Sequence, residues 1–268
     1  MLIGGLQKLT LIDYPGKIAC TVFTVGCNFR CHFCHNPELV RNLKVAATSG
    51  VGKTVAAGFS PRQTISEQKF FEFLKSRQGL LDGICITGGE PTLYRDLPEF
   101  IKKIKALGFS VKLDTNGTAP DVLEKLLKDK MLDYIAMDIK ASIKVPSSPA
   151  STCRRGEAGK FQVPSPYEMV VGAGVNLGDI KRSINIIKSS GLEHEFRTTV
   201  VPGLHVKEDI LDIAKFIKGA KKYYLQQFRA GEKILNQEYK TVKPYPAEFL
   251  KDLKEEIKDF FEVCEVRD

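Results

Sequence analysis

Leu81-Asp-Gly-Ile-Cys-Ile-Thr87 is a short apolar run that stops at Gly88-Gly89-Glu90-Pro91, and this stretch indicates the fold. Its length, its isoleucines and the glycines that end it are typical of a buried strand. Buried strands of this kind occur mainly in parallel sheets, where each strand is followed by a covering helix. The sequence on either side should therefore alternate between strand and helix.

This alternation is present along the chain. Residues at helical spacing follow each short apolar run, and glycine or proline often separates the two. We predict strands at residues 17–25, 81–87, 109–113, 134–139, 196–201 and 223–228, and helices near residues 64–74, 97–107, 122–127, 180–187, 210–217 and 249–260. Six β/α repeats predict a parallel sheet with helices outside it.

Polar signatures fall where the predicted strands end. They are Gly88-Gly89-Glu90, Asp114-Thr115-Asn116, Asp138-Ile139-Lys140 and Arg197. Periodicity alone does not separate an open sheet from a barrel. In a β/α barrel, however, the carboxyl ends of the strands meet at one mouth, and sites lie there. We therefore predict an α/β protein with a partial (β/α)6 barrel.

Two stretches interrupt the alternation, near residues 43–63 and 142–178, and both are rich in small and polar residues. Loops of this length are usually functional or mobile, so we interpret them as insertions. The 268 residues suit one large domain, and we expect a single domain over residues 1–268.

Composition points away from membranes and nucleic acids. No apolar run approaches the roughly 20 residues that span a bilayer, and the start lacks the pattern of a signal peptide. We therefore expect a cytoplasmic protein. The net charge is +8, but the lysines mostly alternate with apolar residues, as on the wet face of an amphipathic helix. We expect no nucleic-acid partner.

Three of the seven cysteines lie close together, in Cys27-Asn-Phe-Arg-Cys31-His-Phe-Cys34. Thiolates are soft ligands that suit iron–sulfur clusters. A cubane cluster normally takes four thiolates, one for each iron. No fourth cysteine stands nearby, so one iron would remain open to a substrate or cofactor.

Two alternatives remain for this motif. His32 or His35 could complete a zinc site with the three cysteines, although the loop is short for four good ligands. The other alternative is that three of the seven cysteines stand close together by chance. A separate pattern, Ala47 to Thr54, matches a relaxed phosphate loop, but it lacks a strong strand before it and a helix directly after it.

Cys-x3-Cys-x2-Cys with an aromatic residue before the last cysteine, here Phe33, resembles the signature of the radical S-adenosylmethionine (SAM) superfamily. The resemblance implies that Cys27, Cys31 and Cys34 hold a 4Fe-4S cluster whose open iron binds SAM. It implies reductive cleavage of SAM and a 5′-deoxyadenosyl radical that abstracts a hydrogen atom. Gly88, Gly89 and Glu90 are similar to the glycine-rich segment that receives the SAM amino group. A strand end without side chains lets an ammonium approach, and Glu90 offers an acceptor.

Within this superfamily the chain resembles the glycyl-radical-enzyme activases, the activators of pyruvate formate-lyase and of anaerobic ribonucleotide reductase. The segments that carry this likeness are residues 13–16, 34–37, 114–117, 138–140 and 200–203, together with the opening residues 5–14. The resemblance implies an oxidoreductase with a glycyl radical enzyme as its protein substrate. We expect that partner to be anaerobic ribonucleotide reductase, and the electron donor to be a low-potential protein such as flavodoxin or ferredoxin. The alternative is a radical SAM enzyme that modifies a small molecule or a peptide.

The same resemblance assigns charged residues at the strand ends. Asp114, Thr115 and Asp138 would line the SAM carboxylate region, and the matching groups of pyruvate formate-lyase activase hold a monovalent cation. Lys140 and Arg197 would contact SAM. Arg229 falls where that activase has a SAM-contacting histidine, which is a departure from the pattern. Each charge alone could be a surface ion pair of little consequence, but their common location at strand ends argues for a site.

Overall fold

The computed structural model describes residues 1–40, 43–45, 54–56, 64–144, 154–155, 161–162 and 165–268. Residues 47–53 of the phosphate-loop pattern, most of the predicted insertion 43–63 and a smaller part of the predicted insertion 142–178 lie outside these residues. The insertions and the single domain therefore stay predictions.

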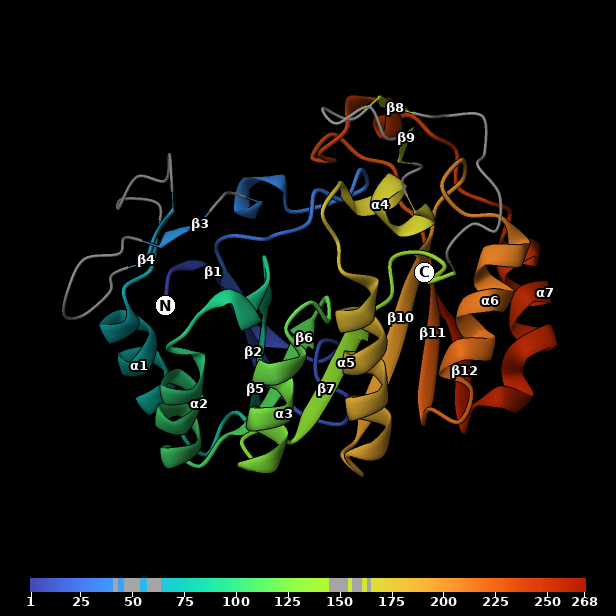
Figure 1. Ribbon diagram of the computed structural model, residues 1–268. Helices are drawn as coiled ribbons and strands as arrows, with labels where there is room; N and C mark the ends of the chain where they lie inside the picture. Colours follow the sequence, from blue (N-terminus) through green and yellow to red (C-terminus); the bar gives the residue numbers. More distant parts are fainter. Residues whose placement is uncertain (41–42, 46–53, 57–63, 145–153, 156–160, 163–164) are drawn as a thin grey trace.

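An eight-stranded sheet forms the centre of the molecule, and its strand order confirms the predicted β/α alternation (Figure 1). The strands, in spatial order, are β1 (Ile3–Thr10), β2 (Ala19–Thr24), β5 (Gly83–Gly88), β6 (Ser110–Thr115), β7 (Tyr134–Asp138), β10 (His194–Val200), β11 (Lys222–Gln227) and β12 (Val263–Arg267). All neighbours are parallel except β1, which runs antiparallel to β2. The sheet is open, with β1 and β12 as its edges, which is compatible with a partial barrel.

Helices follow the strands as the sequence predicts. They are α1 (Glu67–Lys75), α2 (Leu97–Ala106), α3 (Pro120–Lys128), α4 (Pro166–Val171), α5 (Leu177–Ser189), α6 (Lys207–Ile217) and α7 (Ala247–Ile257). Figure 1 shows α2, α3 and α5 side by side in front of the strands, with α6 and α7 beside β11 and β12. The short helix α4 lies within the predicted insertion 142–178 and was not expected. Two short strand pairs stand apart from the sheet, β3 (Leu43–Val45) with β4 (Thr54–Ala56) and β8 (Arg154–Arg155) with β9 (Phe161–Gln162).

The strands are apolar on the face that the helices cover and polar on the other. Ile84 and Ile86 of β5 are fully buried in the main core together with helical residues such as Ile101. Side chains alternate along a strand, so Cys85 of β5 and its register partner Lys112 of β6 point to the opposite, inner face. The inner face is therefore lined with polar groups that lead toward the carboxyl ends of the strands.

Candidate active site

The three cysteines lie on the loop that follows β2, and two other segments hold this loop in place. The backbone N–H groups of Arg30 and His32 donate to Val171 O (2.7 Å) and Val170 O (3.3 Å) at the end of α4. On the other side, Leu235 N donates to Cys34 O (3.1 Å). The loop is thus fixed by contacts with segments far away in the sequence, in addition to its own hydrogen bonds, such as the one from Cys34 N to Cys31 O (3.0 Å).

The cysteine loop and the strand ends enclose one cavity, as the positions of the polar signatures predict. It is lined by Cys27, Phe29, Cys31, Cys34, Val40, Thr87, Gly88, Gly89, Glu90, Asp114, Thr115, Asn116, Asp138 and Lys140. Ten of the expected site residues are among them. Phe33, Arg197 and Arg229, which were also expected, do not line it.

Gly88 and Gly89 allow the end of β5 to lie directly against the chain that leads into the cysteine loop. A Cβ on Gly89 would stand 2.0 Å from the carbonyl oxygen of Gly26, and one on Gly88 would stand 2.3 Å from Thr24 N. Gly88 also has a φ of +113°, a conformation that favours glycine. Backbone hydrogen bonds from Gly89 N to Thr24 O (2.8 Å) and from Glu90 N to Gly26 O (2.7 Å) close the contact.

Glu90 is buried, and its carboxylate accepts four hydrogen bonds. Oε1 accepts from the backbone N–H of Thr92 (3.1 Å), from the Thr92 hydroxyl and from the Thr115 hydroxyl (2.8 Å), and Oε2 accepts from Asn116 N (2.7 Å). Burial raises the pKa of Glu90, although these hydrogen bonds oppose the shift. The carboxylate therefore ties the ends of β5 and β6 together. Among the described residues, Oε2 accepts from one donor, which leaves it acceptor capacity toward the cavity.

A row of alternating charges lies beside the cavity, at the ends of β6 and β7 and in the middle of β10. Arg197 was expected at a strand end, but it is the fourth of the seven residues of β10 and lies in register with Asp138, the last residue of β7. Arg197 donates through Nε to Asp138 Oδ1 (2.8 Å) and through Nη1 to Asp114 Oδ2 (3.2 Å), and Lys140 donates to Asp138 Oδ2 (2.9 Å). Burial alone would raise the pKa of Asp138, but Arg197 and Lys140 outweigh it and hold the pKa well below its ordinary value. The expected cations are thus present, and they are paired with the expected carboxylates.

The chemistry of the three thiols fits an iron–sulfur cluster. Burial raises the pKa of Cys27 to about 12 and that of Cys31 to about 11, and it raises the pKa of Cys34 as well. Such thiols are protonated at neutral pH until a metal replaces the proton. Three soft donors line one cavity, and no other cysteine that the structure describes lines it, so a cubane held by these three would keep one iron free of their thiolates.

The zinc alternative finds less support. His32 Nε2 lies 3.0 Å from Met169 O, its Nδ1 lies 3.2 Å from Asn236 Nδ2, and its ring stacks on Tyr239, so it is used in packing the loop. In the part of the chain that the structure describes, no three His, Cys, Asp or Glu side chains surround a point where a single metal ion could bind. A cubane does not need such convergence, because each thiolate binds a different iron.

Sequence reasoning missed several side chains that position the site. Tyr167 of α4 accepts a hydrogen bond from Lys140 N (3.1 Å), and His205 Nε2 lies 2.7 Å from Lys140 O. Asn116 Nδ2 lies 4.0 Å from Cys27 Sγ and donates to Asn28 Oδ1 (2.9 Å). Asn116 stood within a quoted strand-end signature, whereas Tyr167 and His205 carry no local signal.

Phe33 and Arg229 lie at the margin of the site. Phe33 is buried, with the Lys140 ammonium 5.8 Å from its ring centre. Arg229 is exposed after β11. Burial lowers the pKa of His35, and the charges of Lys140 and Arg229 lower it further. Arg229 is therefore near the cysteine loop, and its contact with SAM stays a prediction.

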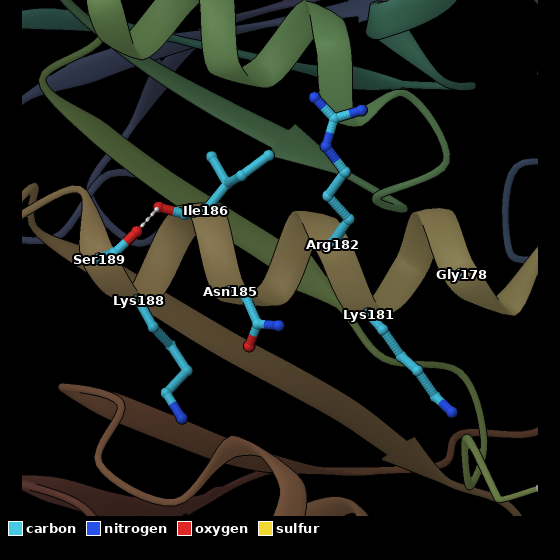
Figure 2. A pocket seen from close by; sticks show the side chains of 7 residues that line it. All are labelled: Gly178, Lys181, Arg182, Asn185, Ile186, Lys188 and Ser189. Carbon is cyan, nitrogen blue, oxygen red and sulfur yellow. Dashed lines mark hydrogen bonds between the residues drawn. The ribbon is translucent and has the colours of Figure 1, made fainter.

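A second hollow lies on the outer surface of α5, away from the strand ends. Figure 2 shows its lining side chains, which all come from this one helix: Gly178, Lys181, Arg182, Asn185, Ile186, Lys188 and Ser189. Arg182 turns toward α3, where it pairs with Asp121 and Glu124. Exposed ion pairs of this kind contribute little, and the hollow lacks the converging polar groups of a ligand site.

Comparison with known proteins agrees with this site. A family model described as the radical SAM superfamily matches residues 21–217. A Methanocaldococcus jannaschii protein assigned as a glycyl-radical enzyme activating enzyme is 34% identical over 248 residues, which cover 92% of this chain and 87% of that protein. The chain therefore belongs to the radical SAM superfamily, in its group of glycyl-radical enzyme activating enzymes.

Other matches are less complete. The pyruvate formate-lyase-activating enzyme of Listeria monocytogenes is 32% identical, and the match covers 52% of each chain. The GTP 3′,8-cyclase of Aquifex aeolicus is 27% identical over 78% of this chain and 55% of its own. Streptococcus suis SuiB bound to S-adenosylmethionine has a TM-score of 0.58 at 14% identity, over 90% of this chain and 48% of that one, which shows a shared fold. Among the described residues, no helix is long and apolar enough to cross a membrane.

Proposed function

We propose that this chain is an activase that cleaves SAM reductively and generates a glycyl radical on a partner enzyme. The observation that carries the proposal is the single cavity that Cys27, Cys31 and Cys34 share with Glu90 and Lys140. The same cavity is lined by thiols that can bind a cluster, by the Glu90 carboxylate, which can accept from an ammonium, and by the Lys140 ammonium, which can bind a carboxylate. This combination suits the amino acid part of SAM beside an open iron.

When bound, the cofactors would supply the chemistry: an electron delivered through the cluster would cleave SAM to methionine and a 5′-deoxyadenosyl radical, which would remove a hydrogen atom from glycine. In the proposed roles, the three cysteines hold the cluster, and Gly88, Gly89 and Glu90 receive the SAM amino group. Asp114, Thr115 and Asp138 shape the carboxylate region. Lys140 and Arg197 bind the SAM carboxylate or ribose oxygens, and Phe33 and Arg229 border the site.

We propose anaerobic ribonucleotide reductase as the partner, because residues 5–14 resemble proteins of that activator group. A low-potential protein such as flavodoxin or ferredoxin would supply the electron. The thiols must stay reduced to bind iron, which suits the cytoplasm. We propose further that residues 1–268 act as one domain.

The function can be tested by anaerobic reconstitution with iron and sulfide, followed by SAM and a chemical reductant. We expect 5′-deoxyadenosine from the native chain and none from Cys31→Ala, because the cavity then lacks one of its three thiolates. Cys264→Ala is the matched control, since Cys264 is buried in β12 and does not line the cavity. The proposal would be wrong if Cys31→Ala still produced 5′-deoxyadenosine.

A second experiment identifies the substrate. The reconstituted chain is mixed with SAM and anaerobic ribonucleotide reductase, with pyruvate formate-lyase, or with GTP, and the products are followed by electron paramagnetic resonance and chromatography. We expect a glycyl radical on the reductase. The match to a GTP 3′,8-cyclase favours a small molecule as the second candidate, and consumption of GTP without any glycyl radical would support that reading instead.

A further inference from the structure

The carboxylates expected to hold a monovalent cation are already paired with cations of the chain itself. Each of their four oxygens accepts a hydrogen bond from a positively charged side chain. Lys112 Nζ donates to Asp114 Oδ1, and Arg197 bridges Asp114 Oδ2 and Asp138 Oδ1. Lys140 Nζ donates to Asp138 Oδ2. The residues present therefore do not fit an additional free cation.

Lys112 differs from the other two cations in its position. Its side chain is only 1% exposed, and it extends from β6 on the inner face of the sheet, two residues before Asp114. Its ammonium also lies 3.9 Å from Cys85 Sγ and 5.8 Å from the Tyr134 ring centre, beneath the cavity. The side chains of Lys140 and Arg197 are 17% and 13% exposed and border the cavity, whereas Lys112 is enclosed with Asp114.

Thr115, the third expected ligand of the cation, is also engaged elsewhere. Its hydroxyl donates to Glu90 Oε1 (2.8 Å) and accepts from Gly117 N (3.1 Å). Thr115 follows Asp114 directly in β6, so its side chain leaves the strand on the other face. The Thr115 hydroxyl is therefore hydrogen-bonded to Glu90 and Gly117 and not to the two aspartates.

The charges around this point argue in the same direction. Three cations, Lys112, Arg197 and Lys140, face two carboxylates, and Glu195, which lies 3.7 Å from Arg197, is itself paired with Arg267 (3.0 Å). A free cation added here would lie beside three cationic side chains, each of which is less than one fifth exposed. Such a site repels a further positive charge.

We infer that this chain binds no free monovalent cation between Asp114 and Asp138, because the buried Lys112 ammonium supplies that charge from inside the sheet. Lys112 is then a positioning residue, which holds Asp114 in place for the SAM carboxylate region. The inference rests on the proposed SAM site, and it predicts that SAM binds without potassium or sodium.

The first test measures SAM affinity by calorimetry on the cluster-loaded chain, in potassium chloride and in tetramethylammonium chloride of equal ionic strength. The native chain should bind SAM with affinities that agree within about twofold in the two salts, because its cation is built in. Lys112→Met should bind SAM about tenfold more weakly in tetramethylammonium and recover in potassium, since one unit of charge is then missing. Lys112→Arg should behave as the native chain does.

The second test needs no SAM and compares melting of the metal-free chain in the same two salts. The native midpoint should agree within about 1 °C, whereas Lys112→Met should melt higher in potassium. Lys105→Met is the matched control, since it removes a lysine–aspartate pair with Asp133 outside the site. Its two midpoints should agree.

Two results would overturn the inference. One is a native chain whose SAM affinity or melting midpoint rises with potassium, and the other is a folded Lys112→Met chain that remains indifferent to it. A chain that bound no SAM in either salt would contradict the proposed function, and the melting comparison would still decide whether a cation binds.

Discussion

Glu90 joins the end of β5 to the end of β6 through its carboxylate. Its oxygens accept hydrogen bonds from Thr92, Thr115 and Asn116, and all of these groups are buried. A buried acceptor with several donors is sensitive to replacement, because any group left without a partner keeps its full desolvation cost. The stability of the strand ends should therefore depend on this side chain.

We expect Glu90→Gln to lower the free energy of unfolding by about 1–3 kcal/mol, since the new amide would place a donor opposite one of the existing donors. Denaturant unfolding of the metal-free chain measures the change. Glu99→Gln is the control, because Glu99 is exposed and pairs only with Lys102 in the next turn, and its midpoint should not move. Equal midpoints for both variants would contradict the role of Glu90.

His205 should make the stability of the folded chain depend on pH. Burial lowers its pKa, and its Nδ1 accepts from Val201 N (3.0 Å), so the folded chain keeps the ring neutral. An unfolded histidine gains its proton near pH 6.5, so below that pH the unfolded chain binds more protons. Stability should fall as the pH drops through this range.

The measurement is the loss of unfolding free energy between about pH 7.5 and about pH 5.5 for the native chain and for His205→Gln. Glutamine retains a donor for Lys140 O and does not titrate. We expect the native chain to lose more stability than the variant. A loss of the same size in both would exclude His205 as the titrating group.

The grouping of the three cysteines with the ends of β5, β6 and β7 was predictable from spacing and resemblance, and their roles toward a cluster and SAM stay predictions. Lys112 was not predictable, because a lysine within an apolar strand resembles any other lysine until the inner face of the sheet is known. Tyr167 and His205 act on Lys140 from distant segments, so no local pattern marks them.

At the level of elements, the site depends on the contact between the end of β5 and the chain before the cysteine loop. Gly89→Ala would bring a Cβ to 2.0 Å from the carbonyl oxygen of Gly26, so one of the two segments has to move. We expect lower iron content after reconstitution and a loss of about 1–3 kcal/mol in stability. Iron analysis and denaturant unfolding measure the two effects.

Gly231→Ala is the matched control for this change. Gly231 has an ordinary φ, and nothing lies within 4 Å of the position of its Cβ. Its iron content and midpoint should equal those of the native chain. If Gly89→Ala also took up a full complement of iron, the close contact would not be needed for the cluster.

The predicted elements were those with a strong apolar period. α2 is an example, since it buries one regular face, and β5 was predicted from its continuous apolar run, in which four consecutive residues are buried. β1 and β12 were not predicted, because β1 contains two adjacent glycines and exposed polar residues, and β12 alternates with charges at the edge of the sheet. Helix α4 is only one and a half turns long, and its role in holding the cysteine loop depends on tertiary contacts.

For the molecule as a whole, the polar inner face means that the site is not filled by apolar packing. A group that binds there adds stability only to the folded chain. We expect the cluster-loaded chain to melt about 5 °C or more above the metal-free chain under anaerobic conditions. Calorimetry before and after removal of iron with a chelator measures the shift.

Cys31→Ala serves as the control for this comparison, because it should not retain a stable cluster and its two midpoints should coincide. A native chain whose midpoint did not change on removal of iron would show that the cysteine loop keeps its structure independently of the metal. The prediction concerns the folded assembly of loop, α4 and strand ends, since the loop and the strand ends line the cavity and α4 holds the loop in place.

The burial of the three thiols affects how the protein reacts with oxygen. Oxidants react with the thiolate, and the raised pKa values of Cys27 and Cys31 keep the metal-free thiols protonated. Air should therefore destroy the cluster faster than it converts the cysteines to sulfenic acid or disulfides. A molecule that has been in air would keep its three cysteine ligands intact. Its cluster could then be rebuilt from iron and sulfide without synthesis of new protein.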